Sequence, residues 1–228
     1  ISYNIIDTTG LTVAQTATIT INQSNQAPVV AAPITLNVSE DATASMLDLL
    51  QGATDANSDT LTVTGLTVTG NATGITQSGT TLSVNPAAYN SLAASSSEVI
   101  AYSYTIDDGK SGTVAQTATI TITGANDAPV AVADTNTIDE DGALVIGATS
   151  GVLLNDTDVD TGATLTVTAV EGVAGNVGSL VTLASGSIVQ INADGSYDFA
   201  PVQDQLAAGQ TTQEVINYTV SDDQGAAV

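Results

Sequence analysis

Apolar and polar residues alternate in short stretches along the chain. In Ile34–Val38, Tyr102–Ile106 and Leu165–Thr168 every second side chain is apolar, and the residues between them are Thr, Ser or Asn. A period of two places one row of side chains on each face of a β-strand, and β-branched residues favour strands. Ala17–Ile21 and Leu61–Thr64 have the same pattern. All five stretches are therefore predicted to be strands.

Turn-forming residues separate these stretches at short intervals, as in Asp107-Asp108-Gly109 and Asn192-Ala193-Asp194-Gly195. Many short strands joined by such turns predict an all-β fold, a sandwich or a barrel. Ala87–Ser97 and Gln203–Gly209, which are rich in Ala, Ser or Gln, are predicted to form helical turns between strands.

An internal repeat divides the chain. Thr12–Ile21 recurs unchanged at Thr113–Ile122, and Asn25–Val29 corresponds to Asn126–Val130. We predict one module over residues 25–125 and a second over 126–228 that lacks its last strand. Residues 1–24 are then the last hairpin of a preceding repeat. Alternatively, they donate a strand to the open edge of a neighbouring copy and build head-to-tail filaments.

Composition and charge narrow the chemistry. The chain has 24 acidic residues, one basic residue and a formal charge of -23, yet 43% of it is hydrophobic, which predicts a folded acidic protein. Such a charge repels nucleic acid and anionic lipid, and no apolar run is long enough to span a bilayer. The sequence has no Cys and no His. Hard cations with oxygen ligands are therefore the metals that it suits.

Acidic side chains gather at the two predicted ends of each module. If the modules stack end to end, the far end of the first meets the linker and the near-end loops of the second. Calcium takes six to eight oxygen ligands from such side chains, whereas the alternative is that they only cap turns and keep the surface soluble. We predict calcium sites at these ends, with candidate ligands Glu40, Asp41, Asp55, Asn57, Asp107, Asp108, Asn126, Asp127, Glu140, Asp141, Asp156, Asp158, Asp160 and Asp222.

Five motifs in order along the chain resemble the VCBS-type and cadherin-like repeats of large bacterial surface adhesins, many of them type I secreted proteins of the repeats-in-toxin class. They are Asn126–Val130, Asp139–Gly142, Asn155–Asp160, Asn192–Tyr197 and Tyr218–Asp223. The resemblance implies Greek-key, Ig/cadherin-like sandwiches in tandem, with calcium at their junctions. It maps the ligands of cadherin-like modules onto Glu40, Asn126, Asp127, Asp158 and Asp160. The chain departs from this pattern at Gln26, where the first linker lacks its acidic residue, and at Asn57, which replaces the second Asp of the loop in the first module.

These observations predict a structural extender at the bacterial cell surface, which projects an adhesive domain for attachment or biofilm formation. Its partners would be neighbouring repeats of the same or an identical chain. A calcium-dependent module that binds glycan or protein, and a filament subunit, are the alternatives. An enzyme is not expected, because the chain has no Trp, one Phe and no imidazole to act as acid or base.

Overall fold

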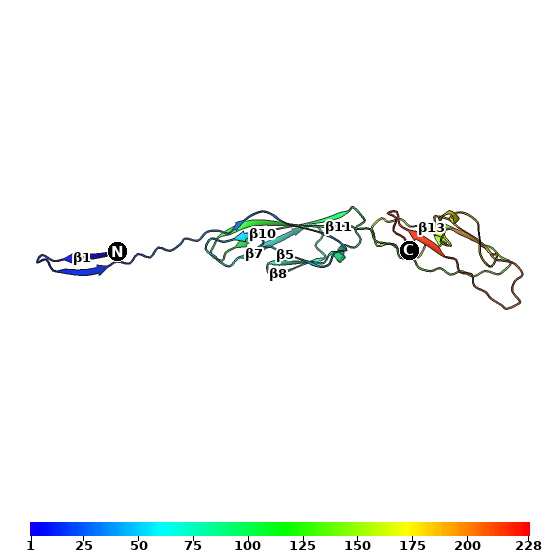
Figure 1. Ribbon diagram of the computed structural model, residues 1–228, viewed down its shortest axis with the longest axis horizontal. Coiled ribbons are helices and arrows are strands. Elements are labelled where there is room, and N and C mark those ends of the chain that lie inside the picture. The colour runs from blue at the N-terminus through cyan, green and yellow to red at the C-terminus, as the bar shows by residue number, and fades with distance from the viewer.

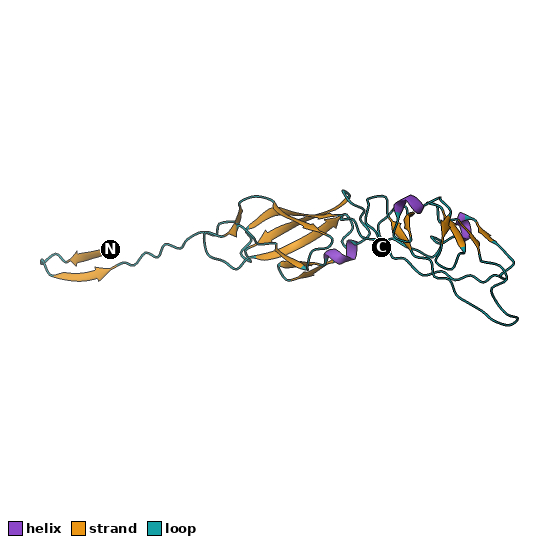
Figure 2. Cartoon of the chain, turned by 45° about the vertical axis from the view of Figure 1, so that its right-hand side comes forward, coloured by secondary structure: helices purple, strands orange, loops and turns teal.

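The computed structural model describes residues 1–228 and arranges them in one elongated row (Figure 1). A hairpin at the N-terminus is followed by an extended connector and then by two β-sandwiches. Figure 2 shows that nearly all regular structure is strand, with a few short helical turns. No helix is long and apolar enough to cross a membrane.

The N-terminal hairpin pairs β1 (Ser2–Ile6) with β2 (Thr12–Thr16), antiparallel. The strand predicted at Ala17–Ile21 is wrong for this chain: Ala17 exchanges backbone hydrogen bonds with Ile1 at the end of the hairpin, and the following four residues pair with no strand. Ile19 and Ile21 are 70% and 90% exposed. Without a neighbouring strand or a core to cover them, alternating apolar residues do not form a strand.

The first module, residues 25–125, packs two main sheets face to face. One has the order β4-β11-β10-β7 and the other β5-β9-β8, while β3 pairs with β6 at the linker end. The strands are β3 (Val29–Val30), β4 (Ile34–Ser39), β5 (Ser45–Asp48), β6 (Ala53–Thr54), β7 (Thr62–Thr69), β8 (Ile75–Ser78), β9 (Thr81–Val84), β10 (Ser97–Asp107) and β11 (Thr113–Thr123). The strands predicted near residues 34, 61 and 102 are confirmed.

The core of the first module follows from the alternation. Ile100, Tyr102, Tyr104 and Ile106 of β10 are buried, whereas the residues between them are only partly buried or exposed. The Tyr104 hydroxyl donates a hydrogen bond of 2.7 Å to the Leu49 carbonyl, so a buried polar group is satisfied across the core. Thirteen buried residues form this core.

The second module, residues 126–228, has a smaller core of six buried residues and shorter strands. Its sheets are β12-β16-β15-β14 and β13-β17. The strands are β12 (Leu144–Ile146), β13 (Thr166–Val170), β14 (Val181–Thr182), β15 (Ile188–Ile191), β16 (Tyr197–Ala200) and β17 (Tyr218–Ser221). Residues 131–139, which follow the linker as β4 does in the first module, form no strand. The strand predicted near residue 165 is β13.

The predicted helical turns are found in part. Pro86–Tyr89 forms a 3-10 turn, whereas residues 203–209 contain only turns and bends. Two other 3-10 turns, Ala148–Ser150 and Ala174–Asn176, belong to loops of the second module.

Candidate metal centre

Parallel pairing of two strands brings Glu40 to the linker. β11 runs parallel to β4, with Thr123 opposite Ser39, so both strands end at the same edge of the sheet. Glu40 follows β4 directly, and the linker follows β11 directly. The Glu40 amide donates to the Thr123 carbonyl at 3.0 Å, which continues the ladder into the junction.

The Glu40 side chain is fully buried at this edge. Its Oε1 accepts from the Ala125 amide at 2.7 Å and its Oε2 from the Leu92 amide at 3.1 Å. Burial raises the pKa of Glu40, and the negative charges of Asp160 and Asp127 raise it further, against the effect of the two amides. The carboxylate is thus fixed in position and faces other acids.

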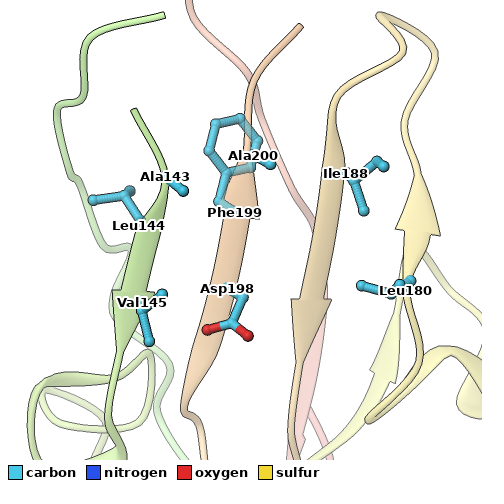
Figure 3. Close-up of a pocket in the computed structure, with 8 residues that line it drawn as sticks. All are labelled: Ala143, Leu144, Val145, Leu180, Ile188, Asp198, Phe199 and Ala200. Carbon is cyan, nitrogen blue, oxygen red and sulfur yellow. The ribbon is translucent and has the colours of Figure 1, made fainter. Parts of the chain in front are cut away.

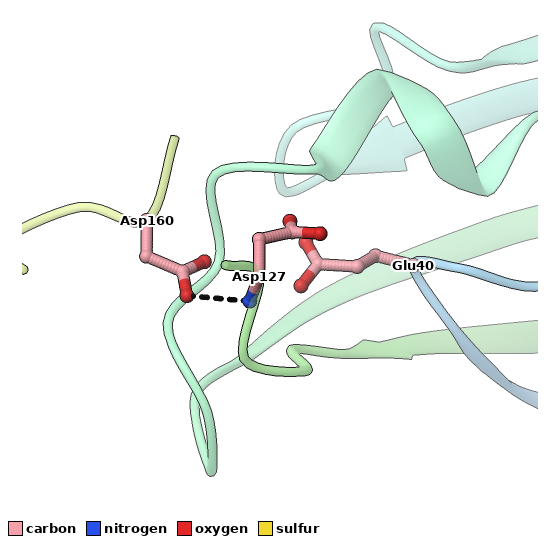
Figure 4. A group of neighbouring side chains, drawn as sticks. All are labelled: Glu40, Asp127 and Asp160. Atoms are coloured by element: carbon pink, nitrogen blue, oxygen red, sulfur yellow. Dashed lines mark hydrogen bonds between the residues drawn. The ribbon is translucent and has the colours of Figure 1, made fainter. Parts of the chain in front are cut away.

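The linker and a loop of the second module complete the group. The Asp127 amide donates to Asp160 Oδ2 at 3.0 Å, as Figure 4 shows, and the Asp160 amide donates to Asp158 Oδ1 at 2.8 Å. One carboxylate oxygen each from Glu40, Asp127 and Asp160 lie within 4.8 Å of one another. We call these three residues and Asp158 the junction group. Residues of both modules contribute to it.

Mutual repulsion makes the junction group unfavourable without a cation. Burial raises the pKa of Asp127, and the charges of Asp41, Asp160 and Asp158 raise it further. At about 5 Å and an effective dielectric constant near 20, each pair of unit charges repels by roughly 3 kcal/mol. Asn90 donates a hydrogen bond to Asp127 Oδ2 at 3.0 Å, but no basic side chain lies in the group.

Two oxygen atoms of the junction group show that it suits a hard cation. Asp158 Oδ2 and Asp160 Oδ1 are buried and have no hydrogen-bond partner. A buried polar atom without a partner costs about 1 to 3 kcal/mol, and more if it is charged. Carboxylate oxygens are the ligands that calcium prefers. The donor set therefore fits calcium by chemistry as well as by position.

Other predicted ligands at this junction have different surroundings. Asn126 donates to Asp222 Oδ2 at 2.8 Å, and Asp222 Oδ1 accepts from the amides of Gln224, Gly225 and Ala226. Burial acts to raise the pKa of Asp222, but these hydrogen bonds outweigh it and lower the pKa. Asp222 therefore anchors the linker through Asn126. Asp41 is exposed and acts on Asp127 only by its charge.

The linker end of the first module repeats the same framework with fewer charges. Asn25 donates to Asp108 Oδ2 at 2.8 Å, and the Gln26 amide donates to Asn57 Oδ1 at 2.7 Å. Oxygens of Asp55, Asp59 and Asp108 lie within 4.8 Å of one another. Asp55 Oδ2 is buried without a partner.

Asp59 and Asp107 also lie at that end of the first module. Asp59 was missing from the predicted ligands, although the loop Asp55-Ala56-Asn57-Ser58-Asp59 contains it. Asp107 is separate from the group, since its Oδ1 accepts from the Gly109 amide within its own turn.

The remaining candidates lie away from both clusters. Glu140 Oε2 accepts from the amides of Gln205 and Leu206, both at 2.9 Å, so it closes a loop of the second module, and Asp141 is exposed. Asp156 Oδ1 accepts from the Val132 amide at 2.8 Å, and the nearby charge is that of Asp134. Burial, and then that charge, raise the pKa of Asp156.

A shallow apolar depression of about 250 Å³ lies across β12, β16 and the neighbouring strands of the second module (Figure 3). Its only charged side chain is Asp198, and the Phe199 ring is mostly buried. Sugar-binding sites use exposed aromatic faces and several converging polar groups. This depression offers neither, so the two acidic clusters remain the better candidate site.

Comparison with known families identifies the modules. Residues 24–123 match the family model of the cadherin-like domain, and residues 126–228 match that of the bacterial cadherin-like domain. The chain thus carries two cadherin-like domains in tandem, and the predicted all-β, cadherin-like sandwich fold is confirmed. Such domains generally bind calcium and have extracellular adhesion or repeat-type roles.

Solved structures similar to the chain include Drosophila N-cadherin EC1-4, with 12% identity and a TM-score of 0.45 over 90% of this chain and 48% of that one. The human desmocollin-1 ectodomain has 12% identity and a TM-score of 0.37, over 96% of this chain and 38% of that one. An endo-fucoidan hydrolase of glycoside hydrolase family 107 has 16% identity and a TM-score of 0.34, over 100% of this chain and 32% of that one. The chain thus spans half or less of their length. No curated protein matches it.

Proposed function

We propose that the chain is an extender segment of a long extracellular bacterial adhesin of the VCBS-type, repeats-in-toxin class. In this proposal, calcium stiffens the joint between residues 25–125 and 126–228, and the row of modules projects an adhesive domain for surface attachment or biofilm formation. The observation that carries the proposal is the pair of buried, unpartnered oxygens of Asp158 and Asp160 beside Glu40 and Asp127.

The origin of the ligands explains how binding would stiffen the joint. Glu40 belongs to the first module, Asp127 to the linker, and Asp158 and Asp160 to the second module. Calcium bound there would supply the positive charge that offsets the repulsion among them. The carboxylates of Glu40, Asp158 and Asp160 each accept from a backbone amide, and that of Asp127 accepts from Asn90. Because they are already held in this way, only the angle between the modules has to be fixed.

Small-angle scattering and thermal unfolding of the whole chain, in millimolar calcium and in chelator, test this proposal. Calcium should lengthen the particle and raise the melting temperature. Binding only to the folded, aligned state adds about 2.7 kcal/mol when the free calcium concentration is 100 times Kd. The double variant D158N/D160N should behave in calcium as the wild type does in chelator.

A matched control removes the same charge elsewhere. D198N/D204N replaces two exposed aspartates of the second module and should keep the full calcium response. Superimposable scattering profiles with and without calcium would exclude the stiffened joint. An equal calcium response in both double variants would exclude the junction group as its cause.

The N-terminal segment supports a second candidate, a filament formed by strand donation between copies. Thr12–Ile21 has the sequence of β11, with Ile19 and Ile21 exposed. In the second module, Val228 lies beside β17 and exchanges two backbone hydrogen bonds of 2.9 Å with Val220 of that strand. The donated strand of a second copy would extend this pair.

Light scattering tests the filament. It should show oligomers that grow with protein concentration and that vanish when residues 1–24 are removed. A monomer at all concentrations would exclude the filament.

A further inference from the structure

A separate group of oxygen atoms lies in the body of the second module. It consists of Asp134 in the segment after the linker, Val152 and Asp156 in the loop before β13, and Tyr218 at the start of β17. None of these residues belongs to the junction group. The three stretches are far apart in sequence, so the fold brings the group together.

Asp156 is the central residue of this group. Its side chain is only 9% exposed, and the Val132 amide donates to its Oδ1 at 2.8 Å. Its other oxygen, Oδ2, is buried and has no hydrogen-bond partner. An unsatisfied carboxylate oxygen in this environment is costly unless a cation or a proton compensates it.

Asp134 and Tyr218 provide the neighbouring oxygens. The Tyr218 hydroxyl hydrogen-bonds to Asp134 Oδ2 at 2.9 Å and lies 3.3 Å from the Val152 carbonyl. The charges of both Asp134 and Asp156 act on Tyr218, so the two carboxylates share one neighbourhood. Asp134 is exposed, so one side of this group faces solvent.

The first module contains the same framework without the acids. Tyr104 of β10 donates to the Leu49 carbonyl, as Tyr218 contacts Val152. The Val29–Thr54 pair corresponds to Val130–Thr157, which places Ala53 at the position of Asp156. The first module therefore closes with an apolar residue at this position. The acid is a specific addition of the second module.

We propose that Asp134 and Asp156 bind a hard divalent cation, calcium, within the second module, with the Val152 carbonyl as a further oxygen ligand. The ion would tie residues 131–139, which lack a strand partner, to β17 and to the loop before β13. β4 is held in the first module by pairing with β11; the cation would replace that function. This inference does not depend on calcium at the junction.

Calcium titration calorimetry on the whole chain tests the site. D156N and D134N should each lower the number of bound calcium ions by one relative to the wild type. D134N is the second variant because Asp134 is exposed and its loss leaves the core intact. The junction variant D158N/D160N should retain this site, so failure of one proposal is distinguishable from failure of the other.

Terbium, which replaces calcium and emits when excited through a nearby tyrosine, gives an independent readout. In the D158N/D160N background, Y218F should lower the sensitised emission at least severalfold. Y197F, which changes another tyrosine of the same module, should not. An unchanged calcium number in both D134N and D156N would overturn the proposal.

Discussion

The same ten residues occur ahead of each module, and their surroundings differ. Thr113–Ile122 lies in β11, between β4 and β10, with Ile120 and Ile122 fully buried. In the identical Thr12–Ile21, the first five residues lie in β2, Ala17 exchanges backbone hydrogen bonds with Ile1, the last four residues pair with nothing, and all ten are exposed. Because the sequences are equal, the difference comes entirely from the available partners.

The linkers that follow these two segments also form similar loops but differ in the number of acidic side chains around them. Asn25–Asp108 and Asn126–Asp222 hydrogen bonds are both 2.8 Å, so the loops form in either setting. Only the second linker follows a packed β11. Because β11 pairs with β4, this linker lies beside Glu40, the acid that follows β4 in the preceding module. The loop at each linker thus forms from local residues, whereas the full group of acidic side chains forms only where β11 is packed.

The largest test of this comparison replaces the same isoleucine in each copy. I120A should lower the free energy of unfolding of the first module by about 2 to 5 kcal/mol, the usual cost of a cavity in a core. I19A should change it by less than about 0.5 kcal/mol, as for an exposed site. Urea unfolding followed by tyrosine fluorescence measures both. Equal losses would mean that Thr12–Ile21 is packed against a partner.

Much of the fold and of the candidate metal site could be predicted from the sequence, because the signals for them are local. Alternation revealed β10, and the spacing of Asp158 and Asp160 revealed a loop with two acids on one side. Non-local facts could not be predicted in this way. The absence of a partner for Thr18–Ile21, the Asn90 contact with Asp127 and the approach of Asp134 to Asp156 depend on chain segments that meet only in the fold.

A smaller effect is expected when the first linker is given the acids of the second. Q26D/N57D in a D158N/D160N background should tighten calcium binding at the group Asp55, Asp59 and Asp108 by about tenfold, because calcium affinity rises with ligand charge. It should remain weaker than the wild-type junction, which also has Glu40. Calorimetry measures both affinities. No gain in affinity would show that the loop backbone, rather than the charge, limits this end.

The smallest expected effect is a pH dependence of the calcium-free junction. Burial and neighbouring charge raise the pKa values of Glu40 and Asp127 above 4.5 and 3.8. The folded state then holds these protons more tightly than the unfolded chain, so stability falls as pH rises through the raised values and is regained on acidification. Asp108 and Asp222 have lowered pKa values, so their opposite contribution is lost only below about pH 4.

Thermal unfolding in metal-free buffer, from pH 7 down to the ordinary glutamate pKa of 4.5, measures this effect. The melting temperature should rise on acidification in the wild type and rise less in E40Q. E140Q is the matched control, because Glu140 also accepts two backbone amides but belongs to neither acidic cluster. In saturating calcium the sign should reverse, since protons compete with the ion for the same oxygens. Equal slopes in E40Q and E140Q would mean that repulsion at the junction is already relieved without calcium.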